Sequence, residues 1–345
     1  MSDLVGADRS AIGLGVWKEL PASRARHADN ERDKSHGQAR TGFRGRIHHF
    51  SRRQFVGASL GAALAAGTRF VSAAQTPAGS SSATQVVTLG RTGIKASRLA
   101  QGTGWNGSAR SSAHTRLGEK AFNELIRHGL ERGIAFLDAA DLYGSHPYLR
   151  TALNGVPRDK YILLSKIWPR TEYWNLASGG ARTEVDRFRR ELNSDVIDIC
   201  LIHCMTNANW PNEHERIRDE LSELKAKGAV RAVGVSCHDL GALKAACTHP
   251  WTDVVLARIN NVGKEAAMDG SVEEVAPILK QARADGKMIL GMKIFGAGKL
   301  TSPEQKDASL QYVWGNGLVD AVTIGMLSVE QIDDTIERMN RALIA

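Results

Sequence analysis

The strongest constraint on the fold is a set of three short apolar runs, each ending on a polar, chemically active side chain. The first run starts at Phe136, ends at Asp138 and opens into a loop that carries Tyr143. The second ends on Lys166 and the third on His203. Short apolar runs with polar ends are typical of buried strands, and segments with a helical period lie between them. This alternation predicts a parallel β/α architecture.

The same alternation continues over most of the chain. The predicted strands cover residues 98–102, 136–138, 161–166, 198–203, 230–236, 253–260, 288–293 and 320–325, and the predicted helices cover 118–132, 148–153, 183–192, 213–227, 240–247, 272–284, 305–314 and 329–342. Eight strand–helix pairs in roughly 270 residues is the usual size of a (β/α)8 TIM barrel. Residues 86–90 and 94–97 flank a glycine-containing turn, which predicts an antiparallel β-hairpin ahead of the barrel. The predicted barrel domain covers residues 86–345, with no second domain.

The polar residues that end the strands predict a catalytic site. In a TIM barrel the carboxyl ends of the strands carry the active site, so Asp138, Tyr143, Lys166 and His203 are expected to meet there. A lysine that closes a buried strand needs a counter-charge, which Asp138 can supply. Taken singly, Lys166 fits a charge that extends to solvent and His203 fits a satisfied core histidine. Their occurrence together favours a site.

Four motifs in this region resemble those of the aldo-keto reductases, in that family's order and at close to its spacing. They are Asp138-(x)4-Tyr143-Gly144, Ser165-Lys166-Ile167-Trp168, the run from Asp198 to His203, and Gly234-Val235-Ser236. The resemblance extends from about Val86 to near the C-terminus. It implies a TIM barrel whose bottom is closed by the hairpin, and a reaction that reduces an aldehyde or ketone to an alcohol, or the reverse, with NADP or NAD.

The resemblance also implies a role for each of the four residues. Tyr143 would be the general acid, although a free tyrosine has a pKa of about 10. The ammonium of Lys166 would lower that pKa, and Asp138 would hold Lys166 charged and in place. His203 would direct the substrate carbonyl and donate a hydrogen bond to it. Trp105 and Trp168 would either form walls of the substrate pocket or cover the barrel rim.

The same resemblance predicts a cofactor site. The expected cofactor-binding residues are Ser236, Cys237, Asn260, Met292, Lys293, Gly296, Gly298, Gly325 and Gln331. Cys237 stands where the family often has asparagine, Met292 stands where an aromatic residue is common, and the sixth-strand glutamine falls near Leu256. Arg258 and Asn260 are polar replacements on that strand end. The turn from Gly296 to Gly298 would let backbone amides approach a pyrophosphate.

The identity of the dinucleotide is left open by the residues after the last strand. Gln331 stands where the family often has an arginine for the 2′-phosphate of NADP, which weakens the prediction of NADP over NAD. Lys293 or Lys299 offers a cation that could reach such a phosphate.

Charge and cysteine content exclude several other classes of protein. The formal net charge is +8, but residues 1–74 hold 12 Lys and Arg against 6 Asp and Glu, which leaves the barrel nearly neutral. Without a basic stripe interleaved with aromatic residues, nucleic-acid binding is not expected. The four cysteines, Cys200, Cys204, Cys237 and Cys247, have no zinc-binding spacing. They are expected to be buried free thiols, with a disulfide after export as the alternative.

The segment ahead of the barrel has the pattern of an export signal. Residues 1–50 are polar and are expected to be a disordered n-region. Residues 51–74 combine paired arginines, Arg52 and Arg53, with a short apolar run and a small-residue end, as in a twin-arginine signal peptide. A tethered amphipathic helix is the alternative, since the run is too short to span a membrane. Residues 75–85 are expected to be a linker, and the twin-arginine export machinery is an expected partner of an exported or periplasmic protein.

Two other functions fit the same barrel. A lysine on a barrel strand can form an imine with a carbonyl, so Lys166 also suits a Schiff-base lyase. A catalytically idle barrel that binds a nicotinamide would keep the fold without the reaction. The substrate itself is not predictable, because the loops that form the pocket are where barrels differ.

Overall fold

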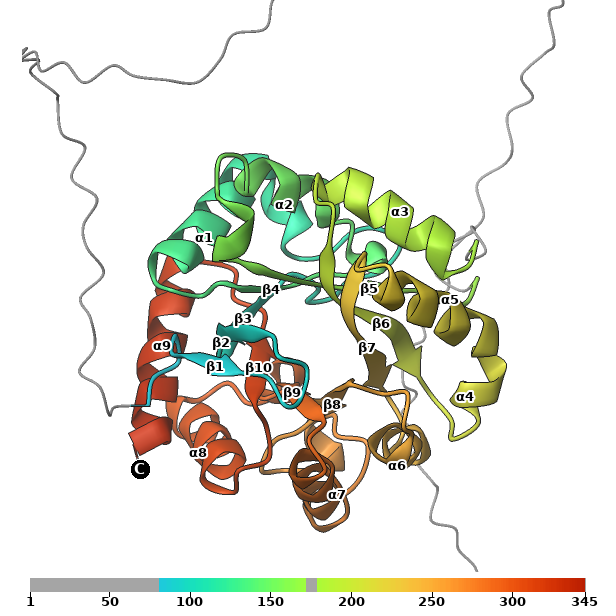
Figure 1. Cartoon of the computed structure of the whole chain (residues 1–345). Coiled ribbons are helices and arrows are strands. Elements are labelled where there is room, and N and C mark those ends of the chain that lie inside the picture. Colours follow the sequence, from blue (N-terminus) through green and yellow to red (C-terminus); the bar gives the residue numbers. More distant parts are fainter. Residues whose placement is uncertain (1–80, 172–178, 345) are drawn as a thin grey trace, which may run out of the picture. The chain divides into compact units, whose positions relative to one another are not determined.

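The computed structural model describes residues 81–171 and 179–344. The predicted n-region, the predicted signal peptide and residues 75–80 of the predicted linker lie outside the described residues. Eight parallel strands close into a barrel in the order β10, β3, β4, β5, β6, β7, β8 and β9 (Figure 1). This confirms the predicted (β/α)8 fold. The strands are β3 (Leu99–Gly102), β4 (Phe136–Asp138), β5 (Ile162–Ile167), β6 (Ile197–Met205), β7 (Val230–Cys237), β8 (Val254–Arg258), β9 (Met288–Met292) and β10 (Ala321–Ile324).

Helices surround the barrel, and most of them follow a strand directly (Figure 1). They are α1 (Glu119–Glu131), α2 (His146–Ala152), α3 (Ala181–Leu192), α4 (Trp210–Glu213), α5 (Glu215–Ala226), α6 (Leu240–Thr248), α7 (Val272–Ala284), α8 (Pro303–Gly315) and α9 (Val329–Ile344). Both α7 and α8 begin with a capping box, formed by Ser271 with Glu274 and by Ser302 with Gln305. Such reciprocal bonds satisfy backbone N–H groups of the first turn and fix where each helix starts. No helix among the described residues is long and apolar enough to cross a membrane.

The predicted hairpin closes the end of the barrel at which the strands begin. It is formed by β1 (Val86–Thr88) and β2 (Lys95–Ser97). The Arg91 N–H donates to the carbonyl of Gly286, just before β9, at 2.8 Å. At Gly90 a Cβ would lie 2.6 Å from the Met288 backbone nitrogen, and φ is +49°, so only glycine fits this close approach. The active face must therefore be at the opposite end.

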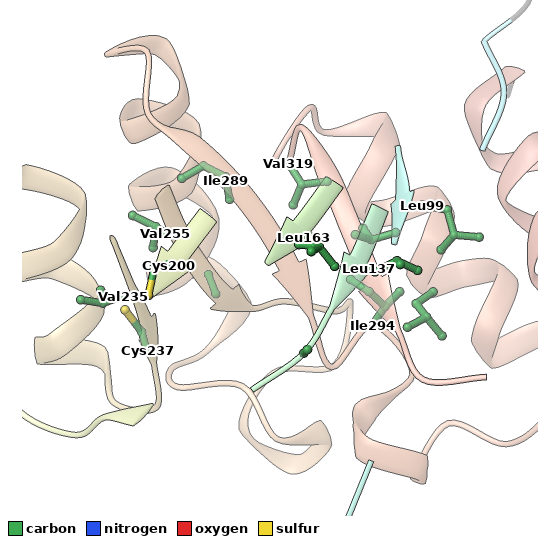
Figure 2. Packing of buried hydrophobic residues seen from close by; sticks show 14 of the residues in the cluster. Leu99, Leu137, Leu163, Cys200, Val235, Cys237, Val255, Ile289, Ile294 and Val319 are labelled. Carbon is green, nitrogen blue, oxygen red and sulfur yellow. The ribbon is translucent and has the colours of Figure 1, made fainter. Parts of the chain in front are cut away.

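Side chains alternate between the inside and the outside of the barrel along each strand. Inside, Phe136, Leu164, Leu201, Leu256 and Leu290 belong to one cluster, together with Leu89 and Ile94 of the hairpin. Outside, the neighbouring positions pack under the helices, among them Leu137, Leu163, Cys200 and Val235, which are labelled in Figure 2. Two separate apolar layers are thus formed by one alternating pattern.

Candidate active site

The alternation brings three of the predicted residues together at the carboxyl ends of the strands. Asp138, Lys166 and His203 each lie two positions after an inward-facing residue, namely Phe136, Leu164 and Leu201. A shift of two keeps a side chain on the same face of a strand. All three are therefore directed into the barrel from adjacent strands, β4, β5 and β6, and all three are buried.

Lys166 is the centre of the hydrogen-bond network. Its ammonium donates to Asp138 Oδ1, to the Ala139 carbonyl at 2.9 Å, and to the Tyr143 hydroxyl at 3.4 Å. The second oxygen of Asp138 accepts a hydrogen bond from Thr323 Oγ1 of β10 at 2.8 Å. The Asp138 carboxylate of β4 is therefore held in place from β10, which lies on the other side of β3. The sequence motifs did not include Thr323. Its position on the eighth strand, two residues after the inward-facing Ala321, could have predicted that it faces the inside of the barrel.

Tyr143 reaches the site from the short turn η2 (Asp141–Tyr143) after β4. Its hydroxyl lies 3.4 Å from His203 Nε2, and the two rings meet edge to face with centroids 5.5 Å apart. Gly104 makes room for it, because a Cβ there would lie 2.2 Å from the tyrosine ring. Gly144 ends the turn with φ +66°, and a Cβ there would lie 1.9 Å from the Arg110 carbonyl oxygen. Two glycines therefore fix the ring position.

Burial dominates the proton affinities of the site. It raises the pKa of Tyr143 above its ordinary value, and the nearby Lys166 offsets only part of that rise. Lys166 lowers the pKa of Tyr143, as expected, but desolvation of the phenolate is the larger effect, so the net change is a raised pKa rather than a lowered one. Burial lowers the pKa of Lys166, but the Asp138 carboxylate outweighs burial and leaves it raised. Tyr143 stays protonated and Lys166 stays charged.

His203 is a neutral imidazole in this structure. Burial is the main reason why the pKa of His203 is well below its ordinary value. Repulsion from Lys166, His238, Arg170 and Lys293 lowers it further. Its Nδ1 is buried without a hydrogen-bond partner among the described residues. A neutral ring carries one N–H and one acceptor nitrogen, so His203 can orient a carbonyl oxygen by donating a hydrogen bond.

The two predicted tryptophans occupy different positions. Trp168 is buried and meets His203 edge to face, with ring centroids 5.4 Å apart. Its backbone N–H donates to Asp141 Oδ2 at 3.1 Å, which ties the end of β5 to the Tyr143 turn. Trp105 is 40 % exposed and lines a cleft. Trp105 therefore forms part of the cleft wall, whereas Trp168 packs against His203.

A cleft of about 370 Å³ starts at Tyr143 and Asp138 and extends to the N-terminal turns of α9. Its lining includes five of the residues predicted for the cofactor: Met292, Lys293, Gly298, Gly325 and Gln331. Gly298 has φ +90°, and a Cβ there would meet the Trp105 ring at 3.7 Å. A second hollow, of about 590 Å³, lies at residues 150–161 and 192–196 and contains none of the four candidate catalytic residues. The cleft at Tyr143 is therefore the candidate site.

The other predicted cofactor residues do not line this cleft. Ser236 accepts a hydrogen bond from the Cys204 N–H at 2.7 Å, and its own hydroxyl proton remains available. Gly296 is buried behind Gly298 in the same turn. Cys237 points outward into the layer under the helices (Figure 2). The structure therefore brings Ser236, but not its neighbour, to the inside of the barrel.

Asn260 is also directed away from the cleft. Its side-chain oxygen accepts from the N–H groups of Val262 and Gly263, and its amide donates to the Ala266 carbonyl at 2.8 Å. These bonds fold the loop after β8 and leave no free group for a ligand. Arg258 takes the inward position on this strand end instead, since Leu256 two residues earlier faces inward.

The cysteines are thiols, as expected. Cys200, Cys237 and Cys247 are buried, Cys204 is partly exposed, and none is in a disulfide. Burial raises the pKa of Cys247 to about 12. Among the residues that the structure describes, no group of three His, Cys, Asp or Glu is arranged to hold a metal ion.

These observations define a (β/α)8 protein with an Asp–Lys pair, a protonated tyrosine and a neutral histidine beside a long cleft. The chain belongs to the aldo/keto reductase family, whose model matches residues 99–316. L-galactose dehydrogenase of Arabidopsis thaliana is 25 % identical over 72 % of this chain and 86 % of its own length. The NADH-specific methylglyoxal reductase of Escherichia coli is 23 % identical over 73 % of this chain and 76 % of its own length.

A solved structure supports the fold. The aldo/keto reductase from Klebsiella pneumoniae, in complex with NADP and acetate, covers 75 % of this chain and 90 % of its own, with a TM-score of 0.54 and 18 % identity. The family and the names of the two relatives support an oxidoreductase.

Proposed function

We propose that this protein is an NAD(P)H-dependent reductase that converts an aldehyde or ketone to an alcohol, or runs the reverse reaction. Tyr143 protonates the carbonyl oxygen as negative charge develops on it. Lys166, held charged by Asp138, stabilises the phenolate that remains, and His203 orients the carbonyl. The observation that carries the proposal is the position of the Tyr143 hydroxyl, 3.4 Å from both Lys166 Nζ and His203 Nε2. A partly buried acid between a cation and a neutral donor suits proton transfer.

The residues of the cleft fit a nicotinamide dinucleotide. Met292 offers an apolar surface in the cleft that Tyr143 also lines. Ser236 is outside the cleft lining but on the inward face of β7, and it has a hydroxyl proton for a carboxamide. Glycine at position 298 leaves the backbone of this turn open to close approach by a ligand, and Lys306 in the cleft lining supplies positive charge for phosphates. When bound, the reduced nicotinamide supplies the hydride. The bound NADP in the Klebsiella pneumoniae structure supports this cofactor class.

The Schiff-base alternative is disfavoured by the state of Lys166. An amine must lose its proton to attack a carbonyl. Here Asp138 and the Ala139 carbonyl hold the ammonium, and the pKa of Lys166 is raised. The idle-barrel alternative is disfavoured by the complete Asp–Lys–Tyr–His arrangement.

Two measurements test the proposal against both alternatives. The barrel, residues 75–345, is incubated with NADH or NADPH and a panel of aldehydes and ketones, and absorbance at 340 nm is followed. Borohydride is then added with substrate, and the protein is analysed for a mass increase at Lys166. Substrate-dependent loss of absorbance without labelling is expected. Labelling without nucleotide oxidation would establish the lyase, and tight nucleotide binding without any turnover would establish the idle barrel.

We also propose, from the residues at 51–74, that the protein is exported by the twin-arginine route. The support is the pattern of paired arginines, short apolar run and small-residue end in the sequence.

A further inference from the structure

Positive charge gathers around the inner end of the cleft. Lys166 and Arg258 lie at the carboxyl ends of β5 and β8, Lys293 directly follows β9, and Arg170 follows β5. Lys166 is neutralised by Asp138, and Arg258 Nη1 lies 3.2 Å from Asp269 Oδ1. Arg170 donates to the Cys204 carbonyl at 3.2 Å. Each of these three cations thus has an acceptor in the protein.

Lys293 differs from the other cations. Within residues 81–171 and 179–344 its ammonium makes no hydrogen bond and no ion pair, although the side chain is half-buried. Burial, followed by repulsion from Arg258 and Lys166, lowers its pKa. A partly buried ammonium without an acceptor is costly, and an anion at this point would remove that cost.

The backbone directs Lys293 into the cleft. Met292 faces inward, so a regular strand would point the next side chain outward. Lys293 has φ +59°, a left-handed conformation that is unfavourable for a residue with a Cβ, and its side chain lines the cleft together with Tyr143. Strained residues of this kind gather at functional sites.

The groups facing Lys293 do not neutralise it. Arg258 Nη2 contacts His238 Nδ1, and burial, with Arg258 and Lys293 next, lowers the pKa of His238 to about 3. His203 is neutral as well. Two neutral imidazoles provide hydrogen-bond donors but no negative charge. The cleft that Lys293 and Tyr143 both line therefore offers a positive charge to an anion.

We propose that Lys293 binds an anionic group of the carbonyl substrate, so that the substrate is an aldehyde or ketone that carries a carboxylate or phosphate. This inference rests on the proposed reductase function. The cofactor pyrophosphate is a second possible source of the anion, and the experiment separates the two sources.

The test compares 4-carboxybenzaldehyde with its methyl ester, which has the same ring and aldehyde without the charge. Lys293→Met removes the ammonium and keeps the side-chain length, while Lys293→Arg keeps the charge. Lys264→Met, at an exposed lysine in the loop after β8, is the control for loss of one positive charge. A charge-assisted hydrogen bond contributes about 1.5–3 kcal/mol, which is about 10- to 100-fold.

The wild type is expected to reduce the acid with a kcat/KM at least tenfold above that for the ester. Lys293→Met should lower kcat/KM for the acid about 10- to 100-fold and change that for the ester less than threefold, with Lys293→Arg restoring most of the loss. The Kd for the nucleotide, from quenching of tryptophan fluorescence, should change less than threefold.

Two outcomes would overturn the proposal. Equal loss for acid and ester, with a matching rise in the nucleotide Kd, would assign Lys293 to the cofactor phosphate. No preference of the wild type for the acid would exclude an anion subsite. If neither aldehyde is reduced, the reductase function is judged by the full panel of aldehydes and ketones, and the subsite is judged separately by the shift in Tm with terephthalate. A shift in the wild type that is absent in Lys293→Met would uphold it, and no shift would reject it.

Discussion

The half-buried Tyr143 hydroxyl lies 3.4 Å from both the Lys166 ammonium and the His203 imidazole, and its proton is the chemically important one in the site. Tyr143→Phe removes that proton and leaves the ring in place. We expect kcat for carbonyl reduction to fall about 10²- to 10⁴-fold, the usual contribution of general acid catalysis, while the nucleotide Kd changes less than threefold. Steady-state kinetics at 340 nm and fluorescence titration measure the two effects. A variant that keeps more than about a tenth of the wild-type kcat would show that another group is the acid.

Asp141 is the second residue whose protonation matters. It is buried, it accepts the N–H groups of Leu142 and Trp168, and burial raises the pKa of its carboxyl to about 7 even though Trp168 and Arg187 work in the opposite direction. Because the pKa in the folded state exceeds its ordinary value of 3.8, the folded state binds the proton more tightly than the unfolded chain. That stabilisation is complete below about pH 4 and is lost as the pH rises to about 7.

Asp141→Asn removes this titration and keeps a side chain of the same shape. The Tm of the variant relative to the wild type is therefore expected to rise between pH 5 and pH 8 in thermal melts. Asp186→Asn, at an exposed carboxylate on α3, serves as the control and should show a pH-independent difference. A difference for Asp141→Asn that stays flat or falls with pH would mean that the carboxylate is stabilised as an anion.

At the scale of elements, the loop after β3 determines where the Tyr143 turn lies. Gly104 has no left-handed φ, so its backbone accepts alanine, but a Cβ would lie 2.2 Å from the tyrosine ring. Gly104→Ala should therefore displace the ring and lower kcat at least tenfold, while Gly129→Ala in α1, where the nearest atom to a Cβ is 3.8 Å away, should leave kcat unchanged.

Combining Gly104→Ala with Tyr143→Phe tests whether the loop acts through the hydroxyl. Residues that work through one group give non-additive effects. The double variant is expected to have nearly the kcat of Tyr143→Phe alone. A further tenfold loss in the double variant would assign Gly104 a separate role, for example in forming the cleft wall.

Strand alternation explains which site residues the sequence could predict. Asp138, Lys166 and His203 each face the inside of the barrel, because the apolar residue two positions earlier on the same strand does so. Their meeting at one site therefore follows from the alternation of side chains along the strands. The same rule excludes Cys237, because neighbouring positions on a strand face opposite sides and Ser236 faces inward. The family resemblance implies a cofactor role for both residues, but only Ser236 faces the inside of the barrel. The predicted helix at residues 272–284 was confirmed to the residue, because the capping box fixes its start.

Other features of the site depend on contacts that a sequence does not contain. Asn260 follows β8 as expected, but its amide is consumed by the loop that it folds. Thr323 bonds to Asp138 from a strand that is 185 residues away in the chain, and this contact exists only because the barrel closes. The raised pKa of Tyr143 reflects how deeply the ring is buried, which the order of residues does not give.

At the scale of the whole molecule, the hairpin and the active site lie at opposite ends of the barrel, as in the general rule that separates stability from function in this fold. The described chain is already part of the barrel at Ala83, which is fully buried and donates its N–H to Asn340 at 2.8 Å. The proposed export signal would have to precede a barrel that folds before transport.

The proposed export of a folded reductase would have a consequence for its cofactor. Outside the inner membrane no pool of NAD(P)H is replenished, so we expect the nucleotide to be bound in the cytoplasm and to leave with the protein. Retention for hours requires a dissociation rate below roughly 10⁻⁴ s⁻¹, and affinity differences are set mostly by such rates. The full chain is expressed alongside a variant that carries Arg52→Lys and Arg53→Lys, and both are fractionated. The wild type should be in the exported fraction and the variant in the cytoplasm.

The exported protein, purified without added nucleotide and then denatured, should release close to one NAD(H) or NADP(H) per chain. The cytoplasmic variant is the matched control, because its barrel is identical and it should carry the same nucleotide. Empty exported protein with micromolar, rapidly reversible binding would contradict retention, since such a complex would lose its nucleotide within seconds of export. Equal distribution of the two chains between fractions would contradict the twin-arginine signal itself, and would place the enzyme beside the cytoplasmic nucleotide pool.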